Sequence, residues 1–389
     1  MTNTILVLDA GQRSALAVTR SLGKLLDISI ITAESAPKSL AGCSTFSQQY
    51  FESPNSGDAP EEYLHWITKL TKDIEFSLII PVTEVTSQLL LMNKWRLPNV
   101  RLPFASYENV MQIADKGNLV NLAVQLGISV PESEWFKNSD DLNRNNIRYP
   151  AVIKPCLSKI YTENGWIATT VKIIQNEADL TRVLNSEGYL KTSPFMVQEF
   201  IPGYGAGIFC LFKDGKPEVF FAHQRLREKP PQGGISVLSE SATPSPVLQE
   251  AAEKLLSGAH WHGVAMVEFR IGEDGTAYLM EVNTRFWGSL QLSIDAGVDF
   301  PALLVSNELN LGLVAPSTYK VGQRLRWLLG DLDSLYIYLK SNYSKKQKLV
   351  RFLQFFIPDF FNTRHEVNRI SDLKPAIFEA KHYLQQFLR

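Results

Sequence analysis

Two Asp-Gly pairs, each between apolar runs, constrain the fold of this chain more than any other feature. Asp274-Gly275 separates apolar runs at residues 264–271 and 277–282, and Asp214-Gly215 also lies between two apolar runs. Such a pair is a strong signal for a tight β-hairpin, because the turn needs backbone conformations that Asp and Gly tolerate. From about residue 149 onward, the sequence therefore predicts an antiparallel α+β region.

Strand and helix signals alternate over the first part of the chain. Residues 4–9, 28–32 and 76–81 are short apolar runs typical of buried strands, and residues 12–26 have the apolar stripe of an amphipathic helix. This order predicts an α/β region with βαβ units and a mostly parallel sheet. Gly11 stands alone in the first loop, so the G-x-G-x-x-G pattern of a dinucleotide site is missing.

The composition indicates an ordinary soluble globular protein of two or three domains. The chain has 389 residues, of which 45% are hydrophobic and 20% charged, and a formal net charge of −1. The basic excess that favours nucleic-acid binding is absent, and no apolar run approaches the length of a membrane span. The N-terminus lacks the basic start of a signal peptide, and the cysteines form no CxxC pair. We therefore expect a cytoplasmic protein without a nucleic-acid partner or a membrane span.

Three oxygen-bearing side chains are expected to converge on the second hairpin. Glu268 and Glu281 lie on either side of its turn, and Glu281 and Asn283 share one face of a strand. Such oxygens suit Mg²⁺, which commonly takes one or two carboxylates together with substrate phosphates. The alternative is two acidic residues on solvated strand faces, although both lie in apolar runs where an unpaired carboxylate is costly. Arg285 continues the same face and could bind an anion through paired hydrogen bonds.

Lys154 closes a short apolar strand run, where a lysine is rarely present for packing. Its ammonium group is a compact charge that suits phosphate oxygens, and the alternative is an exposed lysine at a strand end. Lys116 is a weaker candidate, since taken alone it is more typical of a surface lysine. Glu199-Phe200-Ile201 runs into a Pro-Gly turn, and its backbone could bind the edge of an adenine.

Taken in order, these motifs resemble the ATP-grasp superfamily, and they are most similar to its branch related to the carbamoyl-phosphate synthase large subunit. The motifs are Asp115-Lys116, Ile153-Lys154-Pro155, Gln198-Glu199-Phe200-Ile201-Pro202-Gly203, Glu268 and Glu281-Val282-Asn283-Thr284-Arg285. The resemblance implies a Rossmann-like pre-ATP-grasp domain at residues 1–110 and a two-lobed ATP-grasp core at residues 111–315. Lobe A would span about 111–195 and lobe B about 196–315, followed by a helical C-terminal region at residues 316–389.

The resemblance also implies an ATP site between the two lobes. Lys116 and Lys154 would contact the phosphates. Glu199, Phe200 and Ile201 would line the adenine pocket, largely through their backbone groups.

The same resemblance implies the chemistry beside the phosphates. Glu268, Glu281 and Asn283 would bind one or two Mg²⁺, with Mn²⁺ as a substitute, and Arg285 would face the transferred phosphate or the substrate carboxylate. The family activates a carboxylate as an acyl phosphate and releases ADP. An amine, or less often a thiol, then displaces the phosphate.

Two departures from the family pattern concern the phosphates and the ribose. Residues 156–165 contain only Gly165, where many relatives have a glycine-rich loop. Residues 203–207 contain no carboxylate, where many relatives carry an acidic residue for the ribose. The ribose contact is therefore left unassigned.

A loop expected to face the second substrate follows at residues 223–236. Arg225 and Arg227 precede a Pro-Pro and a Gly-Gly pair and could bind a carboxylate or the acyl phosphate, and the alternative is a surface loop with two solvated arginines. His223 is more typical of a structural histidine than of a base. Trp287 could line the substrate pocket or belong to the core.

These features predict an ATP-dependent ligase that joins a small-molecule carboxylate to an amine. The alternatives are an enzyme that forms carbamoyl or carboxy phosphate, and a nucleotide-binding regulatory protein without turnover. The basic and aromatic residues after 315 allow a helical appendage that packs on the core or across a homodimer, or a contact with a membrane surface.

Overall fold

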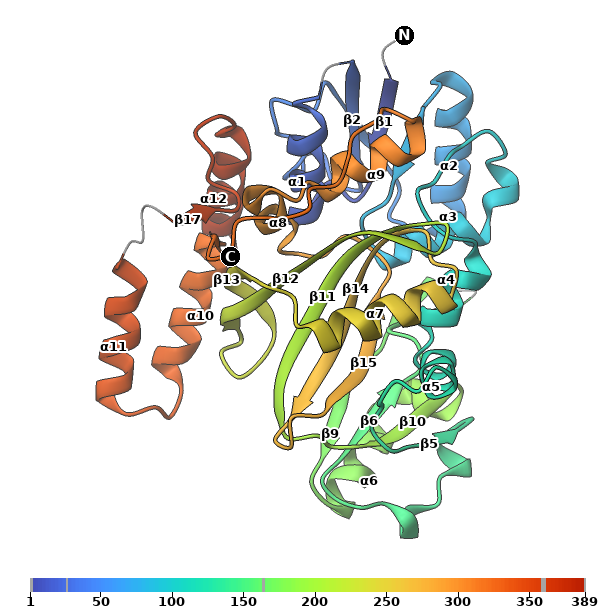
Figure 1. The fold of residues 1–389 in the computed structure, drawn as a ribbon, viewed down its shortest axis with the longest axis vertical. Helices are drawn as coiled ribbons and strands as arrows, with labels where there is room; N and C mark the ends of the chain where they lie inside the picture. The colour runs from blue at the N-terminus through green and yellow to red at the C-terminus, as the bar shows by residue number, and fades with distance from the viewer. Residues whose placement is uncertain (1–2, 26, 163–164, 358–361, 388–389) are drawn as a thin grey trace.

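The computed structural model describes residues 3–25, 27–162, 165–357 and 362–387. Within these ranges, an N-terminal parallel sheet lies against two lobes built on antiparallel sheets, and a group of helices follows at the C-terminal side (Figure 1). No helix in the same ranges is both long and apolar enough to cross a membrane.

The N-terminal sheet is parallel, as expected, with the strand order β3-β2-β1-β4. Ile5 and Val7 pack with residues of helix α1 on one face, and Leu6 packs with residues of α2 on the other. The elements are β1 (Asn3–Val7), α1 (Arg13–Leu22), β2 (Ile28–Glu34), β3 (Gln49–Glu52), α2 (Pro60–Asp73), β4 (Leu78–Ile80) and α3 (Glu84–Met92). The helix expected at residues 12–26 ends earlier, before Gly23, and residue 26 lies outside the described residues.

Lobe A contains an antiparallel sheet of order β5-β10-β6-β9, with helices packed around it. Its elements are α4 (Tyr107–Ala114), α5 (Lys116–Gln125), β5 (Ser133–Phe136), β6 (Ala151–Pro155), β9 (Lys172–Ile174), α6 (Glu177–Ser186) and β10 (Phe195–Glu199). A separate hairpin of β7 (Lys159–Thr162) and β8 (Gly165–Ala168) follows β6. This hairpin stands where many relatives carry a glycine-rich loop, and its residues 163 and 164 lie outside the described residues.

Lobe B is a larger sheet that confirms both expected hairpins. The Asp214-Gly215 turn joins β11 (Gly203–Lys213) to β12 (Lys216–Lys229), and the Asp274-Gly275 turn joins β14 (Gly263–Gly272) to β15 (Ala277–Asn283). Asp214, Gly215 and Gly275 have φ values of 49°, 79° and 81°, the backbone region for which these turns select Asp and Gly. The remaining elements are β13 (Ile235–Ala242), α7 (Pro246–Gly258), α8 (Leu290–Ala296) and α9 (Phe300–Leu309).

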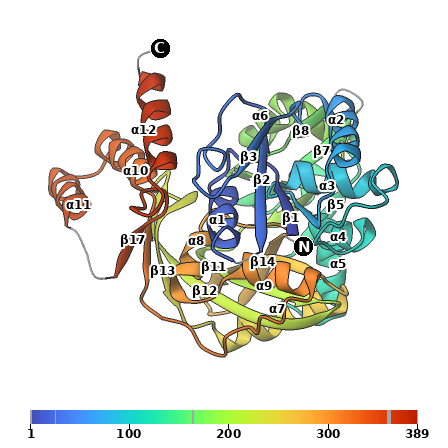
Figure 2. The same cartoon turned by 90° about the horizontal axis from the view of Figure 1, so that it is seen from above.

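The C-terminal region is mainly helical, but it also adds two strands to the sheet of lobe B, whose order is β15-β14-β11-β12-β13-β16-β17. These strands, of three residues each, are too short for a periodic sequence pattern. The region contains β16 (Arg324–Arg326), α10 (Leu328–Lys340), α11 (Lys345–Phe356), β17 (Thr363–His365) and α12 (Lys374–Phe387). Figure 2 shows α10, α11 and α12 together on one side of the molecule, opposite α2 and α3.

The C-terminal region packs directly on the N-terminal domain. Arg20 of α1 donates from Nε to Asp372 at 2.8 Å, and both side chains are buried. Val367 belongs to the same hydrophobic cluster as Leu16 of α1 and Phe300 of α9. Of the interpretations left open by the sequence, an appendage on the core is the one that the structure shows.

Candidate nucleotide and substrate site

The expected metal ligands lie together at the base of the β14–β15 hairpin. The strand register pairs Glu268 with Glu281 and Met266 with Asn283. Asn283 donates from Nδ2 to Glu268 Oε1 at 3.3 Å. The hairpin therefore brings two carboxylates and one amide to a single patch of lobe B.

The electrostatics of this patch suit a divalent cation. Burial, together with repulsion from Glu281, raises the pKa of Glu268, while Arg225 opposes the shift. A cation between the carboxylates would remove that repulsion. No cluster of three or more His, Cys, Asp or Glu occurs among the described residues. The two carboxylates and the amide of this patch are hard oxygen donors, the kind that Mg²⁺ complements with phosphates and water.

Two buried lysines flank the carboxylate pair. Lys116, at the start of α5, places Nζ 3.6 Å from Glu281 and donates to Ser158 Oγ at 2.9 Å. Lys154 on β6 donates to the Met280 carbonyl at 2.9 Å, and burial lowers its pKa to about 8. Lys116 and Lys154 are only 4% and 5% exposed, so neither is a surface lysine.

The segment expected to line the adenine pocket follows β10 directly. The Glu199 amide donates to the Glu132 carbonyl at 2.8 Å, and the Ile201 carbonyl accepts from Arg270 Nε at 3.1 Å. Within the described part of the chain, the Phe200 carbonyl and the Ile201 amide make no hydrogen bond. These two groups belong to one trans peptide unit and point in opposite directions, so only one of them can face a given adenine edge.

Only one of the two loop arginines reaches the site. Arg225 lies 3.4 Å from Glu268, whereas Arg227 points away and forms an ion pair with buried Asp331 at 2.7 Å. The register of β12 against β13 shifts between Arg225 and Arg227, so Leu226 is an extra residue. A β-bulge of this kind sends the next side chain to the other face of the sheet. The expectation that Arg227 joins Arg225 at the substrate is therefore corrected.

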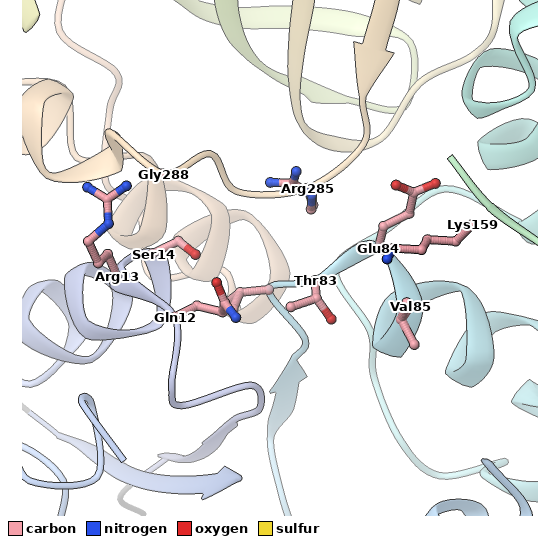
Figure 3. Close-up of a pocket in the computed structure, with 10 residues that line it drawn as sticks. Gln12, Arg13, Ser14, Thr83, Glu84, Val85, Lys159, Arg285 and Gly288 are labelled. Atoms are coloured by element: carbon pink, nitrogen blue, oxygen red, sulfur yellow. The ribbon is translucent and has the colours of Figure 1, made fainter. Parts of the chain in front are cut away.

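Two cavities adjoin the carboxylate patch, and Arg13, Arg285 and Gly288 line both of them. The first, of about 310 Å³, also contains Glu268 and Asn283. The second, of about 230 Å³, lies against the N-terminal domain, and Figure 3 shows Arg285 facing α1 and the start of α3 across it. Its other lining residues are Gln12, Ser14, Val82, Thr83, Glu84, Val85 and Lys159.

The sequence did not single out the α1 residues of these cavities. Arg13 and Ser14 directly follow the Gly11 turn, which was weighed only as a dinucleotide loop. Glu34 accepts a hydrogen bond from the Gly11 amide at 2.8 Å, in keeping with the missing glycine pattern. The signal for Arg13 and Ser14 is a helix start without a capping side chain, but its position opposite Arg285 depends on contacts that sequence spacing does not show.

His223 and Trp287 form the rear of the first cavity. His223 stacks on Phe209 with ring centroids 4.6 Å apart, and its Nε2 lies 3.0 Å from Ser289 Oγ. Burial, reinforced by Arg225, lowers the pKa of His223 to about 3, so the ring is neutral and a poor base. Trp287 is 3% exposed and contacts Phe209 as well, so it belongs to the core and lines the cavity at once.

Comparisons with known proteins give one family match and one curated relative. Residues 191–330 match a family model described as ATP-grasp in the biosynthetic pathway with Ter operon. D-alanine–D-alanine ligase of Aquifex aeolicus (strain VF5) is 24% identical over 203 residues, which cover 49% of this chain and 66% of that enzyme, just under two thirds of its length.

Solved structures share the fold at low sequence identity. N5-carboxyaminoimidazole synthetase from Staphylococcus aureus has a TM-score of 0.62 and 14% identity, over 83% of this chain and 80% of that one. L-amino acid ligase from Bacillus licheniformis has a TM-score of 0.61 and 18% identity, over 79% and 74% of the two chains. Biotin carboxylase from Campylobacter jejuni, solved with a β-γ-ATP ligand, has a TM-score of 0.64 and 14% identity, over 83% and 74%. The chain is thus similar to an ATP-grasp family over residues 191–330, and it shares its fold with the solved structures named above.

Proposed function

We propose that this chain is an ATP-dependent ligase that activates a carboxylate as an acyl phosphate and joins it to an amine, releasing ADP and phosphate. One observation carries the proposal. Glu268, Glu281 and Asn283 meet beside the buried ammonium groups of Lys116 and Lys154, and a cavity lined by three arginines opens from the same patch.

Different residues of the chain would have different roles in such a reaction. The segment from Glu199 to Ile201 lines the adenine pocket and offers it a backbone hydrogen bond. Lys116 and Lys154 neutralise phosphate oxygens, and Arg285 positions the anion that attacks or is formed. Catalysis by these groups is a matter of placement and charge neutralisation, as in other phosphoryl transfers.

Glu268, Glu281 and Asn283 would hold Mg²⁺, which supplies positive charge to the phosphates when it is bound. The Arg225 guanidinium lies 3.4 Å from Glu268 and places positive charge next to that carboxylate. It also lines the first cavity. Arg225 is therefore placed where it could contact an acyl phosphate in that cavity.

The test is turnover of Mg·ATP with pools of carboxylic acids and hydroxylamine, with ADP, AMP and hydroxamate measured together. We expect hydroxamate to form with ADP, and both to be lost in Glu281→Gln. The matched control is Glu273→Gln, which removes an exposed carboxylate from the turn of the same hairpin and should turn over as the wild type does. AMP in place of ADP would contradict the proposal.

The two remaining functions give different results in the same assay. An enzyme that forms carboxy phosphate turns over ATP with bicarbonate and ignores organic acids. A regulatory protein binds Mg·ATP and turns over with no pool. The intact set of Glu268, Glu281 and Asn283 favours the ligase, since a purely regulatory pocket has no need of two adjacent, half-buried carboxylates.

A further inference from the structure

The two cavities form compartments of different chemistry on either side of Arg285. The first contains Glu268 and Asn283 of the metal set, so the phosphoryl group and the reacting carboxylate belong there. The second contains neither of them and is lined by the N-terminal domain. If a molecule extends from the first compartment into the second, its far end contacts the start of α1.

The wall formed by α1 is an open helix N-terminus. The N-cap residue, Gln12, accepts no hydrogen bond with its side chain, so the first amide groups of α1 are left without a capping partner. The neighbouring helix α3 differs, because Thr83 caps it and Asp9 accepts from the Val82 and Thr83 amides. An uncapped helix start carries partial positive charge and free N–H donors, which favour an anion.

Ser14 supplies a second, independent observation at the same place. The residue is 5% exposed, and its hydroxyl has no hydrogen-bond partner among the residues that the structure describes. Figure 3 shows this hydroxyl directed from α1 into the space between Gln12 and Arg285. The hydroxyl oxygen keeps access to the cavity, so a ligand or water there can complete its hydrogen bonds.

The charged side chains of this wall are Arg13, Arg285, Lys159 and one carboxylate, Glu84, so the cations outnumber the anion. Arg285 has no carboxylate within ion-pair distance in the described ranges, and its only hydrogen bond there is to the Phe286 carbonyl at 3.0 Å. Arg13 forms an ion pair with Glu366, and its guanidinium lies 4.0 Å from the centre of the Trp327 ring. Arg13 is therefore held in one orientation, with its remaining donors available to the cavity.

From these contacts we propose that the second compartment is a subsite for an anionic group of the substrate, a carboxylate or a phosphate, that takes no part in the reaction. The inference rests on the proposed ligase function and narrows it. The substrate that fills this compartment is a small bifunctional molecule, with one end at the metal set and a fixed anion at the start of α1, Ser14, Arg13 and Arg285.

The experiment measures anion binding without nucleotide, with inorganic phosphate, succinate and uncharged propanamide as probes in isothermal titration calorimetry. We expect phosphate or succinate to bind the full-length wild type and propanamide not to bind. Ser14→Ala and Arg13→Gln should each weaken the anion about tenfold, the change expected when one hydrogen bond to a charged group is lost. Lys254→Gln, which removes an exposed charge on α7, is the matched control and should bind as the wild type does.

The tighter of the two anions identifies the group that the subsite takes. Anion affinity that is equal in wild type and Ser14→Ala would overturn the subsite, and Ser14→Ala serves even if Arg13→Gln does not fold. Hydroxamate formation with unchanged anion binding in both variants would refute the subsite and leave the ligase intact. Anion binding that depends on Ser14, in a protein without hydroxamate activity, would refute the ligase and leave the anion site.

Discussion

Lys154 illustrates how a single side chain at this site is tuned by its surroundings. Its ammonium group is buried between β6 and β15, and the nearby carboxylates of Glu281 and Glu268 only partly offset the cost of removing it from water. The pKa of Lys154 is lowered to about 8, against an ordinary value near 10.4. In the free protein, Lys154 is therefore charged at neutral pH and loses its proton in a mildly alkaline range.

The affinity for Mg·ATP should fall as the pH rises through about 8, because phosphate oxygens bind the protonated form of Lys154 and deprotonation removes that charge. The expected loss is up to about tenfold per pH unit above that value. Calorimetry between pH 7 and 9.5 measures it. Lys154→Arg should flatten the curve, since an arginine stays charged throughout. A wild type whose affinity is constant over this range would contradict the assignment of Lys154.

Residues near one another on a hairpin could be predicted from the sequence, and residues brought together by tertiary contacts could not. The Asp274-Gly275 turn places the strands that carry Glu268 and Glu281 side by side, so their proximity could be predicted. The exact pairing of Glu268 with Glu281 could not, because it depends on a register shift between Glu268 and Phe269. Arg227 was misplaced because a bulge of one residue leaves no sequence signal. Ser14 was not predicted as a site residue because its proposed role depends on sharing a cavity with Arg285, which is far away in the sequence.

Among the elements, the β7–β8 hairpin is anchored where it meets the N-terminal domain. The Trp166 amide donates to the Gly57 carbonyl at 3.2 Å, and the Trp166 ring packs against the hydrophobic cluster of that domain. Ser158, just before the hairpin, accepts from Lys116. The anchor therefore keeps the hairpin close to the residues that contact phosphate.

Trp166→Ala should weaken Mg·ATP binding about fivefold. The reason is that a hairpin without its anchor must be ordered on binding, and a cost of about 1 kcal/mol in binding free energy corresponds to that change in Kd. Faster amide hydrogen exchange in residues 159–162 and 165–168 should accompany it. Trp95→Ala is the control, because Trp95 is 73% exposed and lies on the surface of the N-terminal domain. Unchanged exchange in the hairpin would show that Trp166 is not its anchor.

At the scale of the whole molecule, one buried ion pair joins the C-terminal region to the N-terminal domain. Asp372 accepts from Arg20 at 2.8 Å, from Ser44 Oγ at 2.8 Å and from the Thr45 amide at 2.9 Å. Burial works against the charge of Asp372, yet these donors hold its pKa below the ordinary value. The contact therefore favours the ionised form in the folded state.

Asp372→Asn should lower the free energy of unfolding by about 3 kcal/mol, because it leaves Arg20 buried without a counter-charge. Urea denaturation measures this. Arg96→Ala, which breaks the exposed pair with Glu61, should cost less than about 1 kcal/mol. Because folding lowers the pKa of Asp372, the ionised carboxylate stabilises the folded state fully at pH values above its ordinary pKa near 3.9. This stabilisation is lost as the pH falls through the lower pKa of the folded state. Equal losses in the two variants would contradict the structural role of the pair.

The sequence predicted the parts of the architecture that form within short segments of the chain. It did not predict the contacts between segments that are far apart in the sequence. The parallel sheet and both hairpins follow from patterns within a few tens of residues. The addition of β16 and β17 to the sheet of lobe B, and the packing of Val367 with Leu16, bring together segments with no pattern in common. The homodimer stays a prediction that light scattering can test.

The ion pair between Arg13 and Glu366 has a consequence for how the protein is made. A growing chain emerges from the ribosome from its N-terminal end, so the residues proposed to bind Mg·ATP, up to Asn283, are all synthesised before Trp327 and Glu366. Until those two residues arrive, Arg13 lacks the partners that orient it. A nascent chain can thus acquire its nucleotide residues early, while recognition of the substrate anion waits for a segment made much later.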